Sequence, residues 1–591
     1  MLLRRTLLAF LLFVAAVPPA HAQKEHGFDN TKTSGQPYWK PEESLKGMKV
    51  PDGWEIKVFA AEPDIINPIS FTVDEKGRLW VVECYEYPKR TPDGKKPKDR
   101  VKILEDTTGA GKADKVTIWA EGKDFPAGDH PRHNGFDLAS GIEVGDGGVY
   151  LGAAPYLFFL QDKKGAGHCD TIDVLLKGFG SEDTHEVLNT LQWGPDGLLY
   201  GLHGIFTHSI VGETKIDAAV WRYNAKAKHF DIFAEGTSNP WGMDFDEHGQ
   251  CFLACCVIPH FFHMIPGGTY IRQDGRQTGS NPYSFGQLKE ICDHTHHKES
   301  GWAHAGTLVL QGDQIPEEYR GSVLMGSIHG CCVKRDILSE RGSTFVAKHA
   351  PDFLASADKN FRPINLRWGP DGSIYLIDWH DQNPCHQAAP DSWDMTHGRI
   401  YKIQRKDIKN DPAPDLSKKT SKELVELLKN NDPWRYRIAL RLLKERAARD
   451  IAPQLEDLLT TSIDDKLSLR ALWALFAVGA FDDAVADKAL DNISPWVRSW
   501  SIRLLGESGN VSAKLLKRFT DLADKDDAPQ VRLHLASTAQ RLKSQDTLPL
   551  IENLMKHKDD AKDPCLPLMI WLSLEPRVIG DRNPTLDFLK T

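Results

Sequence analysis

A hairpin pattern that returns about every fifty residues constrains this chain more than any other feature. The stretch LQWGPDGLLY (191–200) comes back almost intact as LRWGPDGSIY (366–375). In both, Pro presets one backbone angle and Gly supplies a positive φ between two apolar runs, so each is expected to form a β-hairpin. Three more stretches share this plan and carry an aromatic residue three positions after a glycine: TVDEKGRLWV (72–81), IEVGDGGVYL (142–151) and MDFDEHGQCF (243–252).

The spacing of the hairpins predicts the architecture. Aligned on the turn glycine, the copies are separated by 70, 50, 52 and 123 residues, and they fall at Gly77, Gly147, Gly197, Gly249 and Gly372. The last gap leaves room for a sixth copy, which RGSVLMGSIHG (320–330) fits, and the first contains an insertion (85–100) that is typical of a surface loop. A β-sandwich does not explain so regular a period, whereas small repeated sheets closing into a ring do. We therefore predict an all-β six-bladed β-propeller over residues 50–405.

The last third of the chain has a helical period. Residues 406–416 form a polar, proline-containing linker, and helix starts are expected beyond it at Pro433, Lys466, Pro495 and Pro529. Proline is favoured in a first helical turn, and starts about thirty residues apart are typical of stacked helix pairs. Residues 417–591 are therefore predicted to form an all-α, HEAT-like helical repeat domain.

The N-terminus has the features of a secretory signal peptide over residues 1–22. Two arginines precede a short apolar stretch, and Ala20-His21-Ala22 provides the cleavage motif. The apolar stretch is shorter than the ~20 residues that a membrane span needs, so a membrane anchor is the less favoured alternative. Residues 23–49 then form an N-terminal extension. The expected location is periplasmic or secreted, with no membrane span after cleavage near Ala22.

Composition excludes several function classes. The formal net charge is −9, and no block of Lys and Arg is interleaved with aromatics, so a nucleic-acid partner is not expected. The short motifs of zinc proteases, serine hydrolases and P-loop nucleotide-binding proteins are absent from the sequence. No C-x-x-C-H motif is present, so no covalent haem is expected on this chain. The ten cysteines leave disulfides and buried free thiols as open alternatives.

Two further segments resemble each other and raise the question of calcium. EDTTGAGKADKV (105–116) and QDKKGAGHCDTIDV (161–174) share the pattern D-x-x-G-x-G-x-x-D. A calcium loop needs several oxygen ligands at alternate positions, but each segment keeps only its two outer carboxylates. We interpret both segments as turns between strands.

Candidate site residues lie near the ends of the blade strands, because the loops of all blades converge on the axis of a closed ring. Many histidines lie at such positions, and CDHTHHKE (292–299) is the densest group. The turn TSNPWGMDF carries Asn239 and Trp241, Arg362 lies just before a blade strand, and Asp378 ends another. Aromatic and arginine side chains around a channel suit a flat anionic cofactor or a sugar ring, with packing between blades as the alternative account.

The combination of motifs resembles a known family. The signal peptide, LQWGPDGLLY, NPWGMDFDEHG, FRPINLRWGPDGSIYLIDWH, HGRIYKI and the helical repeats are together similar to a family of membrane-bound dehydrogenases from planctomycete and verrucomicrobial bacteria. Members often continue into a cytochrome-c-like domain with C-x-x-C-H. Since that motif is absent here, the resemblance implies another electron route, such as a cytochrome or other acceptor that docks on the helical repeats.

More distantly, the propeller resembles the soluble quinoprotein sugar dehydrogenases, which bind pyrroloquinoline quinone (PQQ) and calcium in the channel. This resemblance implies cofactor contacts at Asn239, His329 and Arg362. Trp241 and Asp378 complete the predicted cofactor-binding set. The position of that family's base is Leu138 here, and the nearby His133 is the candidate for this role.

The sequence leaves more than one function open. In the first hypothesis, an exported oxidoreductase oxidises a sugar or related alcohol: His133 takes the hydroxyl proton, and a bound quinone, with calcium on its carbonyl, accepts the hydride. In the second, the propeller is a non-catalytic module for a glycan or protein, and the helical repeats bind another partner. A metal-dependent, lactonase-like hydrolase is a third alternative, which requires histidines and Asp378 to meet at one ion.

Overall fold

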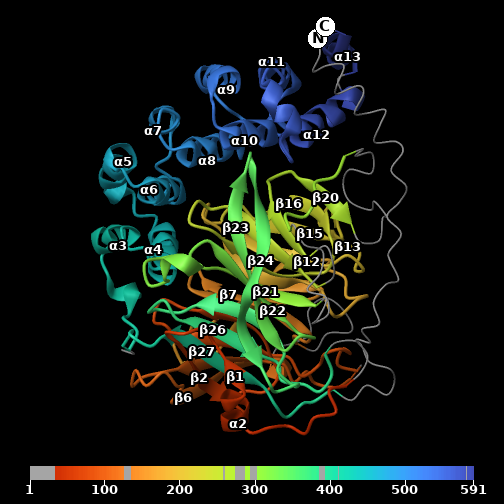
Figure 1. Cartoon of the computed structure of the whole chain (residues 1–591), viewed down its shortest axis with the longest axis vertical. Helices are drawn as coiled ribbons and strands as arrows, with labels where there is room; N and C mark the ends of the chain where they lie inside the picture. The colour runs from red at the N-terminus through yellow and green to blue at the C-terminus, as the bar shows by residue number, and fades with distance from the viewer. Residues whose placement is uncertain are drawn as a thin grey trace.

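The computed structural model describes residues 33–92, 94–124, 135–256, 260–272, 286–292, 303–384, 393–409, 412–580 and 582–590. Within them the chain forms a β-propeller of six blades, followed by a C-terminal region of eleven helices, α3 to α13. Figure 1 shows these helices as an arc along one side of the propeller. The predicted fold class, a six-bladed propeller followed by an all-α region, is confirmed.

Each blade is an antiparallel sheet whose first strand lies innermost and contacts the first strands of its neighbours. Blade 1 contains β3 (Pro68–Val73), β4 (Leu79–Glu83), β5 (Arg100–Glu105) and β6 (Lys115–Glu121). Blade 2 contains β7 (Ala139–Gly145), β8 (Gly148–Ala153), β9 (Tyr156–Gln161) and β10 (Thr171–Lys177). Blade 3 contains β11 (Asn189–Trp193), β12 (Leu199–His203), β15 (Ala219–Asn224) and β16 (His229–Thr237), with β20 (Thr269–Arg272) added in parallel and a small hairpin of β13 (Ser209–Val211) and β14 (Thr214–Ile216) beside it.

The remaining blades follow the same plan. Blade 4 contains β17 (Pro240–Phe245), β18 (Cys251–Cys255) and β19 (Phe261–Met264). Blade 5 contains β21 (His304–Val309), β22 (Ser322–Ser327), β23 (Cys332–Arg341) and β24 (Thr344–Ser356), extended by the short β1 (Met48–Lys49). Blade 6 contains β25 (Pro363–Trp368), β26 (Ile374–Asp378), β27 (Arg399–Arg405) and, as its outer strand, β2 (Trp54–Ala61).

The ring is closed by strands from its two sequence ends. β2 pairs antiparallel with β27, and the register places Trp54 opposite Arg405 and Ala61 opposite Arg399. The innermost strand of blade 6 also contacts that of blade 1. A closed ring leaves no open sheet edge between its first and last blades, and it creates the central channel on which the predicted site depends.

The five recurring hairpins are the two inner strands of blades 1, 2, 3, 4 and 6. Their recurring aromatic residue has a partner in the turn. The hydroxyl of Tyr200 donates to the carboxylate of Asp196 at 2.6 Å. In the preceding blade, Tyr150 donates to Asp146 at 2.7 Å. In blade 1 the indole N–H of Trp80 donates to Asp74 at 2.8 Å in the same way, so in these three blades a hydrogen bond ties the turn to the strand that follows it. Phe252, the equivalent aromatic residue of blade 4, has no polar atom and only packs.

The C-terminal helices form two rows. The inner row, whose members contact one another in succession, is α4 (Pro433–Arg446), α6 (Asp465–Ala477), α8 (Pro495–Gly506), α10 (Pro529–Ala539) and α12 (Leu566–Gly580). The others are α3 (Ser421–Leu428), α5 (Ala452–Thr461), α7 (Asp483–Ala489), α9 (Ala513–Lys525), α11 (Ser544–Leu554) and α13 (Arg582–Lys590). None of the described helices combines the length and apolar composition that crossing a bilayer requires.

The inner row packs on the hairpin turns of the propeller. The turn at Gly249 lies against α6 and α8, where an added Cβ would be 2.7 Å from the ring of Trp473 and 2.6 Å from that of Trp500. Arg503, also on α8, contacts the carboxylate of Asp196 in the blade 3 turn through its guanidinium at 3.0 Å. One face of the propeller is therefore occupied by helices of the same chain.

The N-terminal segment packs on blades 5 and 6. It includes the short helix α2 (Pro41–Lys46). The guanidinium of Arg399, on β27, donates to the hydroxyl of Ser44 at 2.6 Å, and the amide of Gln382 donates to the carbonyl of Gln36 at 2.8 Å. These contacts attach the segment to the face of the propeller that the helices leave uncovered.

The two D-x-x-G-x-G-x-x-D segments are turns between strands, as predicted. The carboxylate of Asp106 accepts the backbone N–H groups of Ala110 and Gly111, and that of Asp162 accepts those of Ala166 and Gly167. Carboxylates that cap their own backbone need no cation to satisfy them.

The cysteines that the structure describes are free thiols. Nine are described, and only Cys256 and Cys292 among them are not fully buried. Of the two alternatives left open by the sequence, free thiols hold for this part of the chain.

Candidate functional site

The central channel has two chemically different ends. Each innermost strand starts on the face that carries the N-terminal segment and runs toward the hairpin turns on which the helices pack. We call the end at the turns the helical end, and the end at which the innermost strands begin the loop end.

The helical end is closed by α4 above a small cavity. The side chains near the ends of the six innermost strands that line this cavity are Thr72, Glu143, Gln192, Asp244, Leu308 and Arg367. The guanidinium of Arg437, on α4, contacts the carboxylate of Asp244 at 2.7 Å, and the amide of Gln192 donates to the same oxygen at 3.0 Å. Arg367 in turn donates to Gln192 at 2.7 Å. These polar groups satisfy one another, so this end holds the two domains together.

Four aromatic side chains meet at the loop end, and we call them the aromatic cluster: Tyr87, His185, Trp379 and Trp393. The ring of Tyr87 lies edge-on to the other three, with centroid distances of 5.5 Å to His185, 5.3 Å to Trp379 and 5.2 Å to Trp393. The two tryptophans stack at 5.1 Å. Three of the rings are partly exposed, and Trp379 is buried.

The origin of these rings locates the cluster on the axis. Tyr87 follows the second strand of blade 1, His185 precedes blade 3, and the tryptophans belong to blade 6. Blades 3 and 6 lie opposite each other in a six-bladed ring, so groups from both contact one residue only near its centre. The segment that carries Tyr87 is half-buried there rather than a surface loop: Arg90 forms an ion pair with Asp137 of blade 2 at 2.6 Å.

Next to His185 in the chain, Glu186 is a buried carboxyl group at the loop end. The residue is 5% exposed, and its Oε2 accepts no hydrogen bond from the described part of the chain. Burial raises the pKa of Glu186 well above its ordinary value, and the negative charge of Asp183 adds to the shift. A carboxyl group in this environment retains its proton at higher pH and either donates or accepts a hydrogen bond.

Asn239 and the base of the Glu186 side chain both lie against Gly204. The side-chain oxygen of Asn239 accepts the backbone N–H of Ile205 at 3.1 Å. A Cβ added to Gly204 would lie 2.6 Å from the Cβ of Glu186 and 3.1 Å from the amide oxygen of Asn239, so the glycine keeps the two side chains close. Trp241, two residues further on, is buried in the apolar core of the propeller.

Arg362 and Asp378 also lie at the loop end, but their polar groups bind the main chain and neighbouring side chains of the propeller. The carboxylate of Asp378 accepts the backbone N–H of Arg362 at 2.8 Å and contacts the ring of His380 at 2.9 Å. The guanidinium of Arg362 donates to the carbonyls of Ile328 and Gln382 at 2.9 and 3.1 Å. Both residues are almost completely buried and act here as internal braces.

The remaining predicted site residues do not join one group. His329 is partly exposed in the turn after β22, one residue beyond the carbonyl that Arg362 binds. His133, the predicted base, lies outside the described residues. The structure thus associates Arg362, Asp378 and the His329 turn at the junction of blades 5 and 6, and Asn239 with Glu186 at that of blades 3 and 4.

Comparison with protein-family models matches residues 40–407 to a family described as a domain of unknown function, DUF7133. The chain belongs to this family. The matched range runs from the N-terminal segment to just beyond β27, so the DUF7133 region comprises the propeller with the segment packed on it, and the helices follow it. A search of curated proteins found no significant match.

Among solved structures, the DUF7133 propeller is similar to sugar dehydrogenases. The PQQ-bound aldose sugar dehydrogenase from Streptomyces coelicolor is 15% identical, with a TM-score of 0.38 over 60% of this chain and 100% of that one. The PQQ domain of pyranose dehydrogenase from Coprinopsis cinerea is 11% identical, with a TM-score of 0.37 over 61% and 97%. The apo aldose sugar dehydrogenase from Escherichia coli is 13% identical, with a TM-score of 0.35 over 60% and 100%. No residue role in this chain is transferred from these similarities.

Two of the predicted quinone contacts, Arg362 and Asp378, already have partners within the protein. A quinone that carries carboxylates needs cationic donors. The one arginine predicted for this purpose, Arg362, directs its terminal nitrogens to two main-chain carbonyls and to the sulfur of Cys331 at 3.2 Å. The carboxylate of Asp378 is likewise satisfied by backbone N–H groups and His380. In this arrangement Arg362 and Asp378 act within the protein, and the Asp378 carboxylate is engaged by the backbone and His380 rather than by an ion.

Proposed function

We propose that the loop end of the channel binds a carbohydrate-like ligand, with the aromatic cluster as its platform and Glu186 and Asn239 as its polar contacts. The observation that carries this proposal is the meeting of aromatic rings from blades 1, 3 and 6 on the axis, with the buried Glu186 directly after His185 in the chain.

The chemistry of the residues matches this class of ligand. The apolar faces of a sugar ring pack against aromatic rings, and its hydroxyl groups need donors and acceptors at fixed positions. When it holds its proton, Glu186 provides both a donor and an acceptor, and the side-chain NH₂ of Asn239 provides donors. Since both groups are uncharged in this state, they suit neutral hydroxyls better than an anionic ligand.

Calorimetry of the purified full chain against a panel of neutral mono- and oligosaccharides tests this proposal. We expect saturable binding to at least one class of glycan, lost or weakened in Trp393→Ala and retained in Tyr87→Phe, which keeps the ring. Binding that is equal in the wild type and Trp393→Ala would place the ligand elsewhere, and no binding to any sugar would remove the proposal.

Oxidation of a ligand hydroxyl is the second candidate function, and the buried carboxyl of Glu186 favours it. A base with a raised pKa can accept the hydroxyl proton near neutral pH. The hydride would need an acceptor of the quinone class. Dye reduction by the wild-type chain with a sugar, PQQ and calcium supports this candidate if Glu186→Gln abolishes the turnover but keeps sugar binding. Binding without dye reduction supports the non-catalytic module.

Export and partner docking belong to the same proposal. Cleavage near Ala22 would release a periplasmic or secreted chain, and N-terminal sequencing of the mature protein tests it. A cytochrome or other electron acceptor would have to dock on the outer helices, since the inner row packs on the propeller. Cross-linking of the full chain to a periplasmic cytochrome fraction tests this docking.

A further inference from the structure

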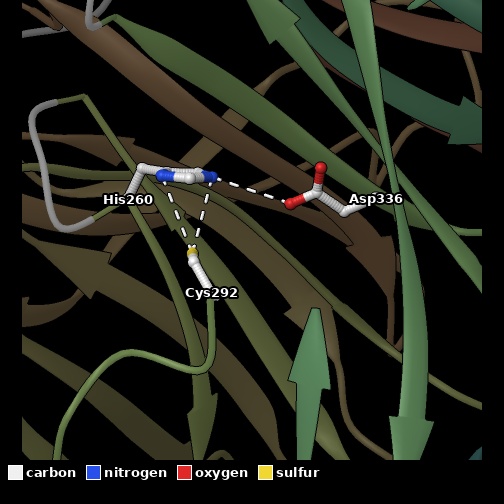
Figure 2. A group of neighbouring side chains, drawn as sticks. All are labelled: His260, Cys292 and Asp336. Atoms are coloured by element: carbon white, nitrogen blue, oxygen red, sulfur yellow. Dashed lines mark hydrogen bonds and ion pairs between the residues drawn. The ribbon is translucent and has the colours of Figure 1, made fainter. Parts of the chain in front are cut away.

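Three side chains with metal-binding chemistry converge between blades 4 and 5 (Figure 2). His260 precedes β19 of blade 4, Asp336 lies on β23 of blade 5, and Cys292 forms a parallel bridge with Ala347 of β24. His260 and Asp336 are 0% exposed, and Cys292 is partly exposed. The three residues come from separate segments, so their convergence is a property of the fold rather than of one local turn.

The distances between their ligand atoms match a small coordination sphere. The Sγ of Cys292 lies 3.5 Å from the Nε2 of His260, and that nitrogen lies 3.7 Å from the Oδ2 of Asp336. All three ligand atoms fall within 4.8 Å of one another. A tetrahedral zinc ion, with bonds of about 2.3 Å to sulfur and about 2.0–2.2 Å to nitrogen and oxygen, separates its ligand atoms by roughly 3.4–3.6 Å. The two spacings from Nε2 of His260 are within a few tenths of an ångström of this geometry, and the sulfur of Cys292 lies no more than 4.8 Å from the carboxylate of Asp336.

Neighbouring histidines fix two of the three groups. The ring of His304 stacks on that of His260, with centroids 4.2 Å apart. His349 is the register partner of Asp336 on β24, and its Nδ1 lies 3.5 Å from Oδ1, the carboxylate oxygen that faces away from His260. Residues that orient a ligating carboxylate and an imidazole ring in this way are the usual surroundings of metal ligands.

We propose that His260, Cys292 and Asp336 bind a zinc ion, with His349 as a positioning residue on the outer oxygen of Asp336. Nitrogen, sulfur and carboxylate oxygen together are a ligand set that zinc prefers over calcium or magnesium. The thiolate and the carboxylate neutralise the two charges of the ion, so the buried site carries no net charge. The ion ties the segment 286–292 to both blades and acts as a clip between them.

A Cys–His–Asp nucleophile is the competing explanation for the same residues. An activated thiol needs a positive environment that lowers its pKa. Here the sulfur of Cys292 lies within 4.8 Å of the carboxylate of Asp336, a negative neighbour. The sulfur also lies 3.7 Å from the carbonyl oxygen of Phe261. These surroundings disfavour an unmetallated thiolate.

The test uses the purified full chain, stripped with a chelator and titrated with zinc chloride. We expect one zinc per chain by elemental analysis, a higher melting temperature with zinc, and a thiolate-to-metal charge-transfer band when cobalt replaces zinc. Cys292→Ser should lose the charge-transfer band, and its zinc affinity should fall at least tenfold. Cys169→Ser, which alters a thiol of blade 2, is the matched control and should keep both.

Several results would overturn the proposal. One is the absence of bound zinc and of a cobalt band in the wild-type chain. Another is equal zinc affinity in Cys292→Ser and Cys169→Ser. A third is rapid alkylation of Cys292 at neutral pH that His260→Asn abolishes, because that reactivity identifies a nucleophile. If His260→Asn does not fold, His349→Asn serves in its place, and a metal site then requires weaker zinc binding with the cobalt band retained.

Discussion

The two ends of the propeller channel use polar residues in opposite ways. At the helical end, Asp244 and Arg437 face each other across the boundary between propeller and helices, and the guanidinium of Arg437 donates a hydrogen bond to the carboxylate of Asp244. At the loop end, Glu186 is just as buried, but its Oε2 has no hydrogen-bond partner among the described residues. Burying a polar group without a partner costs folding free energy. The comparison therefore indicates stability at the first end and ligand chemistry at the second.

The strongest test of this comparison is Asp244→Ala. The substitution leaves Arg437 and Gln192 without their common acceptor beneath α4. Removing one partner of a buried ion pair destabilises a protein by about 3–5 kcal/mol, and the lower end of this range applies here because the Arg437 side chain is 26% exposed. Urea unfolding should show a loss of this size. The control, Lys514→Ala, breaks an exposed pair with Asp487 and should cost less than ~1 kcal/mol. Equal effects of both variants would mean that the helical end is not the stabilising one.

A second test separates packing from backbone strain at the docked turns. Gly249 and Gly147 have φ values of 72° and 79°, so alanine is strained at both. Only at Gly249 would the new Cβ meet the rings of Trp473 and Trp500. Gly249→Ala should therefore cost about 1–3 kcal/mol more than Gly147→Ala in unfolding free energy, the range for overpacking. Equal losses of unfolding free energy in the two variants would show that α6 and α8 shift to make room for the new Cβ.

At the loop end, Trp379→Ala should change ligand binding more than any of the helical-end variants that still fold. Aromatic pairs contribute about 0.5–1.5 kcal/mol beyond burial, so we expect sugar affinity to fall about two- to tenfold. Calorimetry with the best-bound glycan measures the change. Trp379→Phe keeps a ring and should recover part of the affinity. A large loss of binding in Gly249→Ala with none in Trp379→Ala would reverse the roles of the two ends.

The smallest effect is expected in the pH dependence of stability. Glu186 binds its proton more tightly in the folded than in the unfolded chain, because burial raises its pKa. Between the two pKa values the folded state holds more protons, so stability present at low pH is lost as the pH rises through this window. Glu186→Gln removes this contribution and should flatten the fall of unfolding free energy from about pH 4.5 upward. Parallel curves for the two proteins would contradict the raised pKa.

Much of the fold could be predicted from the turns alone. The glycine in each hairpin turn recurs because the turn needs a positive φ. In blades 2 and 3 the aromatic residue three positions later is a tyrosine that hydrogen-bonds the turn aspartate. Both requirements are local, so they are visible in one sequence. The packing of helices on these turns is not local, and nothing in the spacing of Gly249 indicates that Trp473 and Trp500 cover it.

The candidate site was less predictable for the same reason. Arg362 and Asn239 were placed at the correct end of their strands, but only the structure shows that Arg362 donates to main-chain carbonyls. Tyr87 lies in an insertion with the composition of a surface loop, and its contacts with blades 3 and 6 depend on ring closure. Glu186 did carry a signal: it precedes an innermost strand, at nearly the same place as Asn239 in the next blade.

The pairing of β2 with β27 has a consequence for how this protein is made. An emerging chain releases Trp54 from the ribosome long before its partner Arg405 has been synthesised. Blade 6 therefore stays incomplete, with an apolar strand edge exposed, until nearly all of the ring has left the exit tunnel. Such intermediates are prone to aggregate and depend on chaperones. Nascent chains arrested ahead of Arg399 should remain protease-sensitive, and release of only a few more residues should protect the whole ring at once.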